Sequence, residues 1–210
     1  PDGQGSLPSE NTVSSFGSNG IIGIAPYAPD CTECTGTSQD NPIYYGCSGT
    51  SCTVAGIPQA SQLSNPVSLF AQDNNGVILS FPDPGDAPQE KLNGTLTFGI
   101  GTQSNNALTA TQRLLTDQYG HVTATFNGAS VYAFLDSGSN GLYFTDSAIP
   151  ACTGSGDWPY FYCPPQTVAL NATLTGFGQT TSASVNFNVA NAQMLYNTGN
   201  LAFNDIGGSL

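Results

Sequence analysis

The residues best suited to chemistry are Asp136-Ser137-Gly138-Ser139, which directly follow a run of apolar and aromatic residues. That run covers residues 131–135, and a second apolar run begins shortly after the turn, at residues 142–144. Apolar runs bounded by turn residues are typical of buried strands, so we expect Asp136 where a core strand ends and a tight turn begins. The simplest interpretation is an aspartate that accepts hydrogen bonds from its own turn. The apolar flanks favour a functional role instead, because a carboxylate there loses hydration that must be replaced.

The sequence contains few residues that could support histidine-dependent, metal-dependent or cofactor-dependent catalysis. His121 is the single histidine, and no Gly-x-Ser-x-Gly motif accompanies it, so we interpret it as a surface turn residue. The sequence lacks the histidine and carboxylate clusters of metal hydrolases, a P-loop and a dinucleotide fingerprint, and we therefore expect neither a catalytic metal nor a cofactor. Acidic residues are scattered, so a pair of glycosidase carboxylates is neither indicated nor excluded.

The charge balance excludes several classes of partner. The chain has 210 residues, enough for one domain or two small ones, and carries a net charge of −12 with only two basic residues, Lys91 and Arg113. Such a chain cannot hold phosphate backbones or an anionic membrane surface, so we expect no nucleic acid partner and no membrane attachment of that kind. No apolar stretch approaches the length of a membrane span.

Six cysteines form two groups. They are Cys31, Cys34, Cys47 and Cys52, followed by Cys152 and Cys163. An even number in an acidic, lysine-poor chain favours disulfides and an extracytoplasmic location, either secreted, periplasmic or at the cell surface. The first group allows three pairings, and its Cys-x-x-Cys spacing leaves zinc binding as an alternative. The second pair is expected to close one loop filled by aromatic side chains.

Turn signals between short strand-like segments indicate an all-β fold. Asn75-Gly76, between apolar runs at residues 67–71 and 77–81, predicts a β-hairpin, and Asn127-Gly128 predicts a second hairpin that leads to Asp136. Further strands are expected within residues 93–101, 167–174 and 182–190.

A family resemblance covers most of the chain. Residues 134–144 resemble the active-site signature of pepsin-like aspartic peptidases, in which two hydrophobic residues precede Asp-Ser/Thr-Gly and a hydrophobic pair follows. Ile21-Ile22-Gly23 is similar to the hydrophobic-hydrophobic-glycine element behind such an aspartate turn. Three segments also resemble a bacterial pepsin-like family of uncharacterised function, and these are Phe98-Gly99-Ile100-Gly101-Thr102-Gln103, Asp136-Ser137-Gly138-Ser139-Asn140 and Phe161-Tyr162-Cys163-Pro164.

The resemblance implies a pepsin-like fold built from double-psi β-barrel lobes. Residues 1–64, with their cysteine-rich excursion, would end a first lobe, and residues 65–210 would form the second. It also implies an endopeptidase that acts on peptides or proteins with two aspartates sharing one proton above a water molecule. Asp136 would be one of them, held by the loop of Ser137, Gly138 and Ser139.

The sequence departs from the family pattern in two places. It has no second Asp-Ser/Thr-Gly, and Asp205-Ile206-Gly207 has one hydrophobic residue where the closing element has two. The second catalytic aspartate is therefore expected from a missing N-terminal lobe or from a dimer partner. Two alternatives remain, a non-catalytic pepsin-like binding or surface protein and a carbohydrate-binding all-β module that uses Trp158 or Tyr160.

Overall fold

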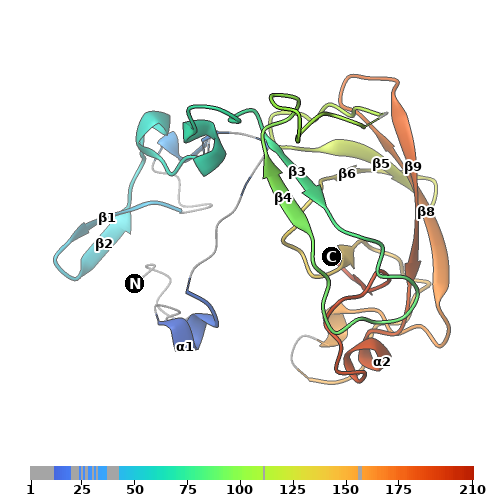
Figure 1. The fold of residues 1–210 in the computed structure, drawn as a ribbon. Coiled ribbons are helices and arrows are strands. Elements are labelled where there is room, and N and C mark those ends of the chain that lie inside the picture. The colour runs from blue at the N-terminus through green and yellow to red at the C-terminus, as the bar shows by residue number, and fades with distance from the viewer. Residues whose placement is uncertain are drawn as a thin grey trace. The chain divides into compact units, whose positions relative to one another are not determined.

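The computed structural model describes residues 12–19, 24, 26, 28, 29, 31, 33–36, 43–110, 112–155 and 158–210 (Figure 1). Strands supply most of the regular structure in these residues and the helices are short, which confirms the all-β class. The sheets of the described residues are open rather than closed into a barrel. No helix among them has the length and apolar character of a membrane span. The chain divides into two compact units, Pro1–Gly76 with Phe98–Thr102 and Val77–Thr97 with Gln103–Leu210.

The second unit is built on an antiparallel four-stranded sheet with the order β6-β5-β8-β9 (Figure 1). Strands β5 (Val122–Phe126) and β6 (Ala129–Ala133) form the hairpin predicted at Asn127-Gly128. Asn127 and Gly128 have φ angles of 49° and 76°, the positive values that a two-residue type I′ turn requires. Strands β8 (Val168–Thr175) and β9 (Ser182–Val189) pair along their whole length.

One face of this sheet packs on a core of aromatic and aliphatic side chains. Val122, Ala124 and Val189 are buried on it. Phe144 covers the same face, with its ring centroid 5.1 Å from that of Phe126 and 5.5 Å from that of Phe187. Successive strand residues point to opposite faces, so the residues between these core positions form the second face of the sheet.

A second cluster of buried residues lies around the C-terminal segment. It contains Cys152, Phe161, Ala190, Ala192, Leu195 and Ile206. Helix α2 (Ala192–Tyr196) supplies part of it and begins at Asn191, whose side chain accepts a hydrogen bond from the Met194 amide. Trp158, in the 3₁₀ turn η4 (Trp158–Tyr160), packs against this cluster with its ring 5.4 Å from that of Tyr196. The aromatic filling of the disulfide loop is thus confirmed for Trp158, whereas Tyr160 is 62% exposed.

All six cysteines are paired, as Cys31–Cys34, Cys47–Cys52 and Cys152–Cys163. Cys47 and Cys52 face each other across the hairpin of β1 (Tyr45–Ser48) and β2 (Ser51–Val54). Of the three pairings possible in the first group, the structure has Cys31 with Cys34 and Cys47 with Cys52. Because all six sulfur atoms are in disulfides, none of these cysteines is a thiolate that could bind zinc. The first unit also contains short helical turns at α1 (Val13–Phe16), η1 (Glu33–Thr35) and η2 (Gln59–Ser61).

The hairpin predicted at Asn75-Gly76 is wrong, because β3 (Val77–Ser80) pairs with β4 (Thr95–Phe98) instead. The chain before the turn forms the 3₁₀ helix η3 (Pro66–Leu69), since Asn65 accepts a hydrogen bond from the Val67 amide and Pro66 occupies the first turn. Proline and an N-cap asparagine favour a helical start over a strand.

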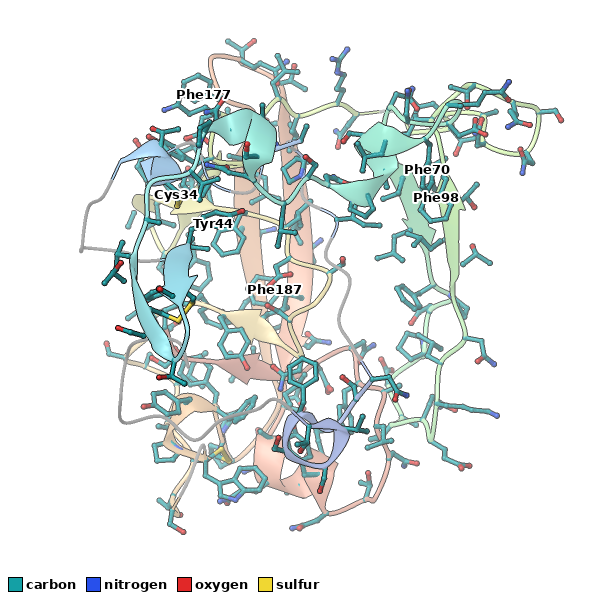
Figure 2. The ribbon with its side chains drawn as sticks, turned by 90° about the vertical axis from the view of Figure 1, so that its left-hand side faces the viewer. Cys34, Tyr44, Phe70, Phe98, Phe177 and Phe187 are labelled. Atoms are coloured by element: carbon teal, nitrogen blue, oxygen red, sulfur yellow. A yellow bond between two sulfur atoms is a disulfide. The ribbon has the colours of Figure 1, made fainter. Side chains whose placement is uncertain are left out.

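The side chain of Asn75 provides a second reason. It donates to the Ile100 carbonyl at 2.9 Å and accepts from the Ile100 amide at 2.8 Å, in the manner of a backbone peptide. Phe70 then packs edge-on against Phe98, with 5.0 Å between ring centroids (Figure 2). These contacts join residues 70–76 to residues 98–102, so the Asn-Gly step ends a loop rather than turning a hairpin.

Candidate aspartate site

Asp136 lies in a turn that follows β6, and its own loop holds both of its carboxylate oxygens. Oδ1 accepts a hydrogen bond from the Gly138 amide at 2.9 Å, and Oδ2 accepts one from the Ser139 hydroxyl at 2.7 Å. The Ser139 amide also donates to the Asp136 carbonyl at 3.3 Å. The hydrogen bond from Ser139, and then that from Gly138, lower the pKa of Asp136 below its usual value against a smaller effect of desolvation. The loop therefore orients an ionised carboxylate.

The other residues of the loop have distinct places. A Cβ atom on Gly138 would lie 3.2 Å from Oδ1 of Asp136, closer than ordinary contact, so the glycine permits the approach. Ser137 is exposed, and in the described residues its hydroxyl makes no hydrogen bond to Asp136. Gly138 and Ser139 are thus the residues that orient the carboxylate.

The chain leading to Asp136 is exposed, and the expectation of a buried strand was wrong. Tyr132 is 77% exposed, Phe134 66% and Leu135 92%. The physical reason is that β6 is an edge strand of the sheet, and its pairing with β5 ends at Ala133. The next two apolar residues therefore extend beyond the sheet, and Asp136 itself is in contact with water.

The chain after the turn is fixed by a short parallel pair of strands. Strand β7 (Leu142–Tyr143) pairs with β10 (Gly207–Gly208), with hydrogen bonds from the Leu142 amide to the Ile206 carbonyl and from the Phe144 amide to the Gly208 carbonyl, both 3.0 Å. The Tyr143 hydroxyl donates to Oδ1 of Asn140, within the turn. The C-terminal segment therefore lies alongside the strand that leaves the aspartate turn.

The sequence pattern did not predict a complete closing element in this C-terminal segment, because only one hydrophobic residue precedes Gly207. The signal that identifies it is the pair of glycines, both buried, after the buried Ile206. A Cβ atom on Gly207 would lie 3.1 Å from the Val189 side chain, and one on Gly208 would lie 2.5 Å from the Tyr160 carbonyl. Close backbone packing, rather than a second apolar residue, is what this position requires.

Ile21-Ile22-Gly23, the expected element behind a first aspartate turn, falls outside the described residues. Asp205, next to the closing segment, is partly buried. Burial raises the pKa of Asp205, its own backbone N–H opposes this, and the negative charge of Asp86 raises the pKa further.

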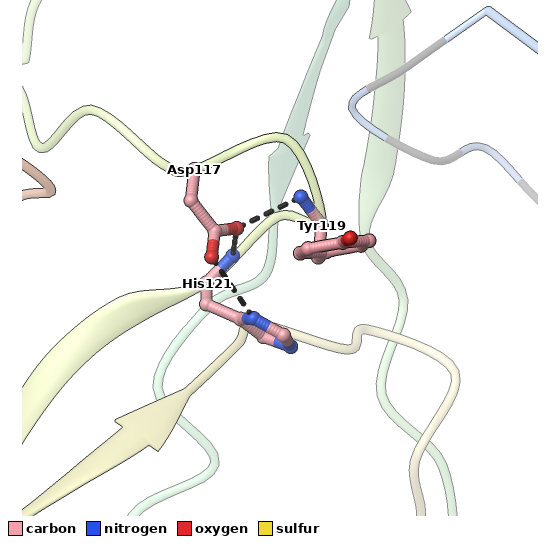
Figure 3. Close-up of polar contacts among 3 residues, drawn as sticks. All are labelled: Asp117, Tyr119 and His121. Atoms are coloured by element: carbon pink, nitrogen blue, oxygen red, sulfur yellow. Dashed lines mark hydrogen bonds and ion pairs between the residues drawn. The ribbon is translucent and has the colours of Figure 1, made fainter. Parts of the chain in front are cut away.

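His121 is half-buried rather than a fully exposed turn residue, and both its amide and its ring contact Asp117 (Figure 3). Asp117 Oδ1 accepts hydrogen bonds from the amides of Tyr119 and His121 at 2.8 and 2.9 Å, and Oδ2 lies 3.2 Å from Nδ1 of His121. Burial raises the pKa of Asp117, but these hydrogen bonds together lower it below its usual value. Apart from their four-residue spacing, no sequence signal indicates this pair.

The Asp117–His121 pair lacks a nucleophile. The His121 ring lies among aromatic rings, 5.5 Å from Tyr132 and 6.2 Å from Phe134. In the described part of the chain it makes no hydrogen bond to a serine hydroxyl or a cysteine thiol, so the pair orders the turn before β5. No group of three or more histidine, cysteine, aspartate or glutamate side chains among the described residues is arranged to hold a metal ion.

Comparison with known proteins identifies the family. A family model described as a protein of unknown function, DUF3443, matches residues 2–210. The chain belongs to this family. No curated protein and no solved structure matches it. The DUF3443 match covers the Asp136 turn, the β7–β10 pair and all three disulfides, so these features all lie within the family's own region.

Proposed function

We propose that this DUF3443 chain is a pepsin-like protein that hydrolyses peptide bonds as an aspartic endopeptidase. Asp136 is the carboxylate that the chain itself contributes, and the substrate is a peptide or protein. The observation that carries the proposal is the turn at Asp136, where Gly138 and Ser139 orient a water-exposed, ionised carboxylate. The parallel pairing of β7 with the Gly207-Gly208 segment supports it, because the resemblance implies a glycine-containing element behind such a turn.

In the proposed mechanism Asp136 acts as the general base. Two close carboxylates share one proton, and the ionised member takes a proton from the water as it attacks the amide carbonyl. In the proposed pair Asp136 is taken as the ionised member, because its loop already donates two hydrogen bonds to its carboxylate. Its partner carries the shared proton and polarises the carbonyl oxygen, and it comes from a second copy of the chain or from a lobe outside these 210 residues.

The three disulfides support a location in an oxidising, extracytoplasmic compartment. Cys47–Cys52 joins a hairpin whose residues are mostly exposed, whereas Cys152–Cys163 closes a loop at a buried cluster.

A non-catalytic binding protein on the same scaffold is the second candidate. The exposed apolar side chains of Phe134 and Leu135 favour it, because exposed apolar side chains beside one another are typical of contact surfaces. In this case the turn at Asp136 keeps its structure but has no partner carboxylate.

Cleavage of a denatured protein substrate from pH 3 to 7 by the full-length protein, with any residues beyond these 210, tests the proposal. Asp136→Asn should lower the rate by at least about 100-fold, since a positioned general base contributes about 10²–10⁴. Asp83→Asn is the matched control, because Asp83 is also exposed and accepts a hydrogen bond at 2.8 Å from the amide two residues later, that of Gly85. The control should keep the full rate.

The dependence on protein concentration separates the two sources of the partner carboxylate. A rate per chain that rises with concentration indicates a site shared between two copies, and a constant rate indicates a site within one polypeptide. Equal rates for Asp136→Asn and the unmodified chain, or no cleavage at any pH and concentration, would refute the catalytic proposal and leave the binding protein.

A further inference from the structure

The second face of the four-stranded sheet carries no charged side chain. Its register identifies the residues on this face, since directly opposed residues of paired strands point to the same side. They are Ser130 and Tyr132 on β6, Thr123 and Thr125 on β5, Ala169, Asn171, Thr173 and Thr175 on β8, and Ser182, Ser184, Asn186 and Asn188 on β9. Each of them is exposed or half-buried, so the face is open to water.

The side chains on this face form a regular array. One row across the four strands runs Tyr132, Thr123, Thr175 and Ser182, and the next runs Ser130, Thr125, Thr173 and Ser184. Neighbours within a row are about 4.8 Å apart, and the rows are about 6.8 Å apart, as pleated antiparallel strands dictate. Hydroxyl groups that both donate and accept hydrogen bonds thus lie at fixed intervals in two directions.

Asparagine side chains order the next part of the array. The Asn171 amide donates to the Ser184 hydroxyl and to Oδ1 of Asn186, each at 2.8 Å. These contacts fix side-chain rotamers before any ligand binds, which reduces the entropy lost on binding.

An exposed aromatic ring lies at one edge of the same face. Tyr132 is 77% exposed and its ring is supported from one side by His121, at 5.5 Å between centroids. His121 is in turn held by Asp117 at 3.2 Å. The Asp117–His121 pair, which has no role in the proposed aspartate mechanism, therefore stabilises the exposed ring of Tyr132.

The charge distribution restricts what this face can bind. None of the 14 acidic residues of this chain of net charge −12 lies on the four strands of this face, and Asp117 lies at its edge, bound to His121. Neither an anionic nor a cationic partner therefore finds a complementary charge among the strand residues. A flat array of hydroxyl and amide groups with an aromatic ring at its edge is complementary to one kind of ligand. That ligand is a neutral chain rich in hydroxyl groups, whose rings have flat apolar faces.

We infer that this face binds a neutral polysaccharide. The Thr, Ser and Asn side chains exchange hydrogen bonds with sugar hydroxyls. Each bond is weak, and the array gains affinity from their number. Tyr132 packs against the apolar face of one sugar ring. The site uses none of the residues of the Asp136 loop and is independent of the proposed peptidase activity. It also differs from the carbohydrate alternative based on Trp158, whose ring packs against a buried cluster.

Affinity electrophoresis of the full chain in gels containing hydroxyethyl cellulose, laminarin or galactomannan tests the inference. We expect retardation by at least one of these neutral polysaccharides, unchanged by 0.5 M NaCl, since the contacts involve no ion pairs. Thr125→Lys and Tyr132→Ala should each weaken binding at least about tenfold, which corresponds to about 1.4 kcal/mol.

The matched controls are Thr95→Lys, an exposed threonine on β4, and Tyr160→Ala, an exposed tyrosine outside the sheet, and both should bind as the unmodified chain does. Thr125→Val removes the hydroxyl while keeping the side-chain shape, and it replaces Thr125→Lys if the lysine variant unfolds. Absence of retardation by all three polysaccharides, retardation lost in salt, or equal binding by the unmodified chain and the Thr125 and Tyr132 variants would overturn the inference.

Discussion

Substitution of Gly208 by alanine tests whether the C-terminal segment really fixes the strand after the aspartate turn. Gly208 lies between two neighbours. The Phe144 amide donates to its carbonyl at 3.0 Å, and it bridges to Phe161 on the other side. A Cβ atom here would lie 2.5 Å from the Tyr160 carbonyl oxygen and 2.7 Å from the Tyr143 ring. The first of these atoms belongs to the backbone, so a rotamer change cannot relieve the contact.

The expected loss of stability follows from those contacts. Overpacking of this kind costs about 1–3 kcal/mol, and a weakened hydrogen bond to Phe144 adds about 1 kcal/mol. We therefore expect Gly208→Ala to lower the free energy of unfolding by about 3 kcal/mol. For a chain of this length that corresponds to a fall in Tm of roughly 6–12 °C.

Thermal and urea unfolding, followed by near-UV circular dichroism of the aromatic residues, measure this loss. Gly36→Ala is the matched control, because a Cβ atom on Gly36 would meet nothing within 4 Å. Its effect should stay below about 1 kcal/mol. If Gly208→Ala and Gly36→Ala have the same Tm within about 2 °C, then β10 does not pack as described and the fixed aspartate turn loses its support.

Two further predictions concern the disulfides and Asp205. Replacing Cys152 and Cys163 by serine should lower the free energy of unfolding, measured in urea, by about 3 kcal/mol, and replacing Cys47 and Cys52 should lower it by about 2 kcal/mol. The difference arises because the two loops span 11 and 5 residues, and the entropy of loop closure grows with length. Equal losses would contradict this entropic argument. The pKa of Asp205 is raised in the folded chain, so its protonated carboxyl favours folding; this contribution is complete below the unfolded-state pKa and is lost as the pH rises through the folded pKa. Asp205→Asn should therefore stabilise the chain at pH 7, by less than about 1 kcal/mol because the group is only partly buried and solvent screens its charge, with little effect at pH 3; a destabilisation at pH 7 would show that the charged form is favoured.

Local sequence signals identified much of the second unit. Asn127-Gly128 predicted a hairpin, and the structure has it with Phe126 opposite Ala129. The alternation within residues 182–190 predicted β9. These signals are reliable because turn chemistry and side-chain alternation act over a few residues.

The errors arose where distant residues decide the structure. Asn75-Gly76 has the same local signal, yet a side-chain contact with Ile100, 25 residues away, turns it into a loop. The apolar run before Asp136 looked buried, but burial depends on position in the sheet, and β6 is an edge strand.

In the candidate site too, local contacts could be predicted from the sequence and contacts between distant residues could not. The contacts of Gly138 and Ser139 with Asp136 lie within three residues and follow from the motif. The contact of β7 with β10 joins residues more than 60 positions apart, and only the paired glycines indicate it.

The three disulfides also determine how the chain can acquire its covalent structure. Their cysteines are 3, 5 and 11 residues apart, so every bond joins near neighbours. Each pair can therefore oxidise as soon as its second cysteine emerges during synthesis or export, before the four-stranded sheet exists. Because the nearest cysteine is the correct partner in every case, oxidative folding of this protein needs little help from a disulfide isomerase.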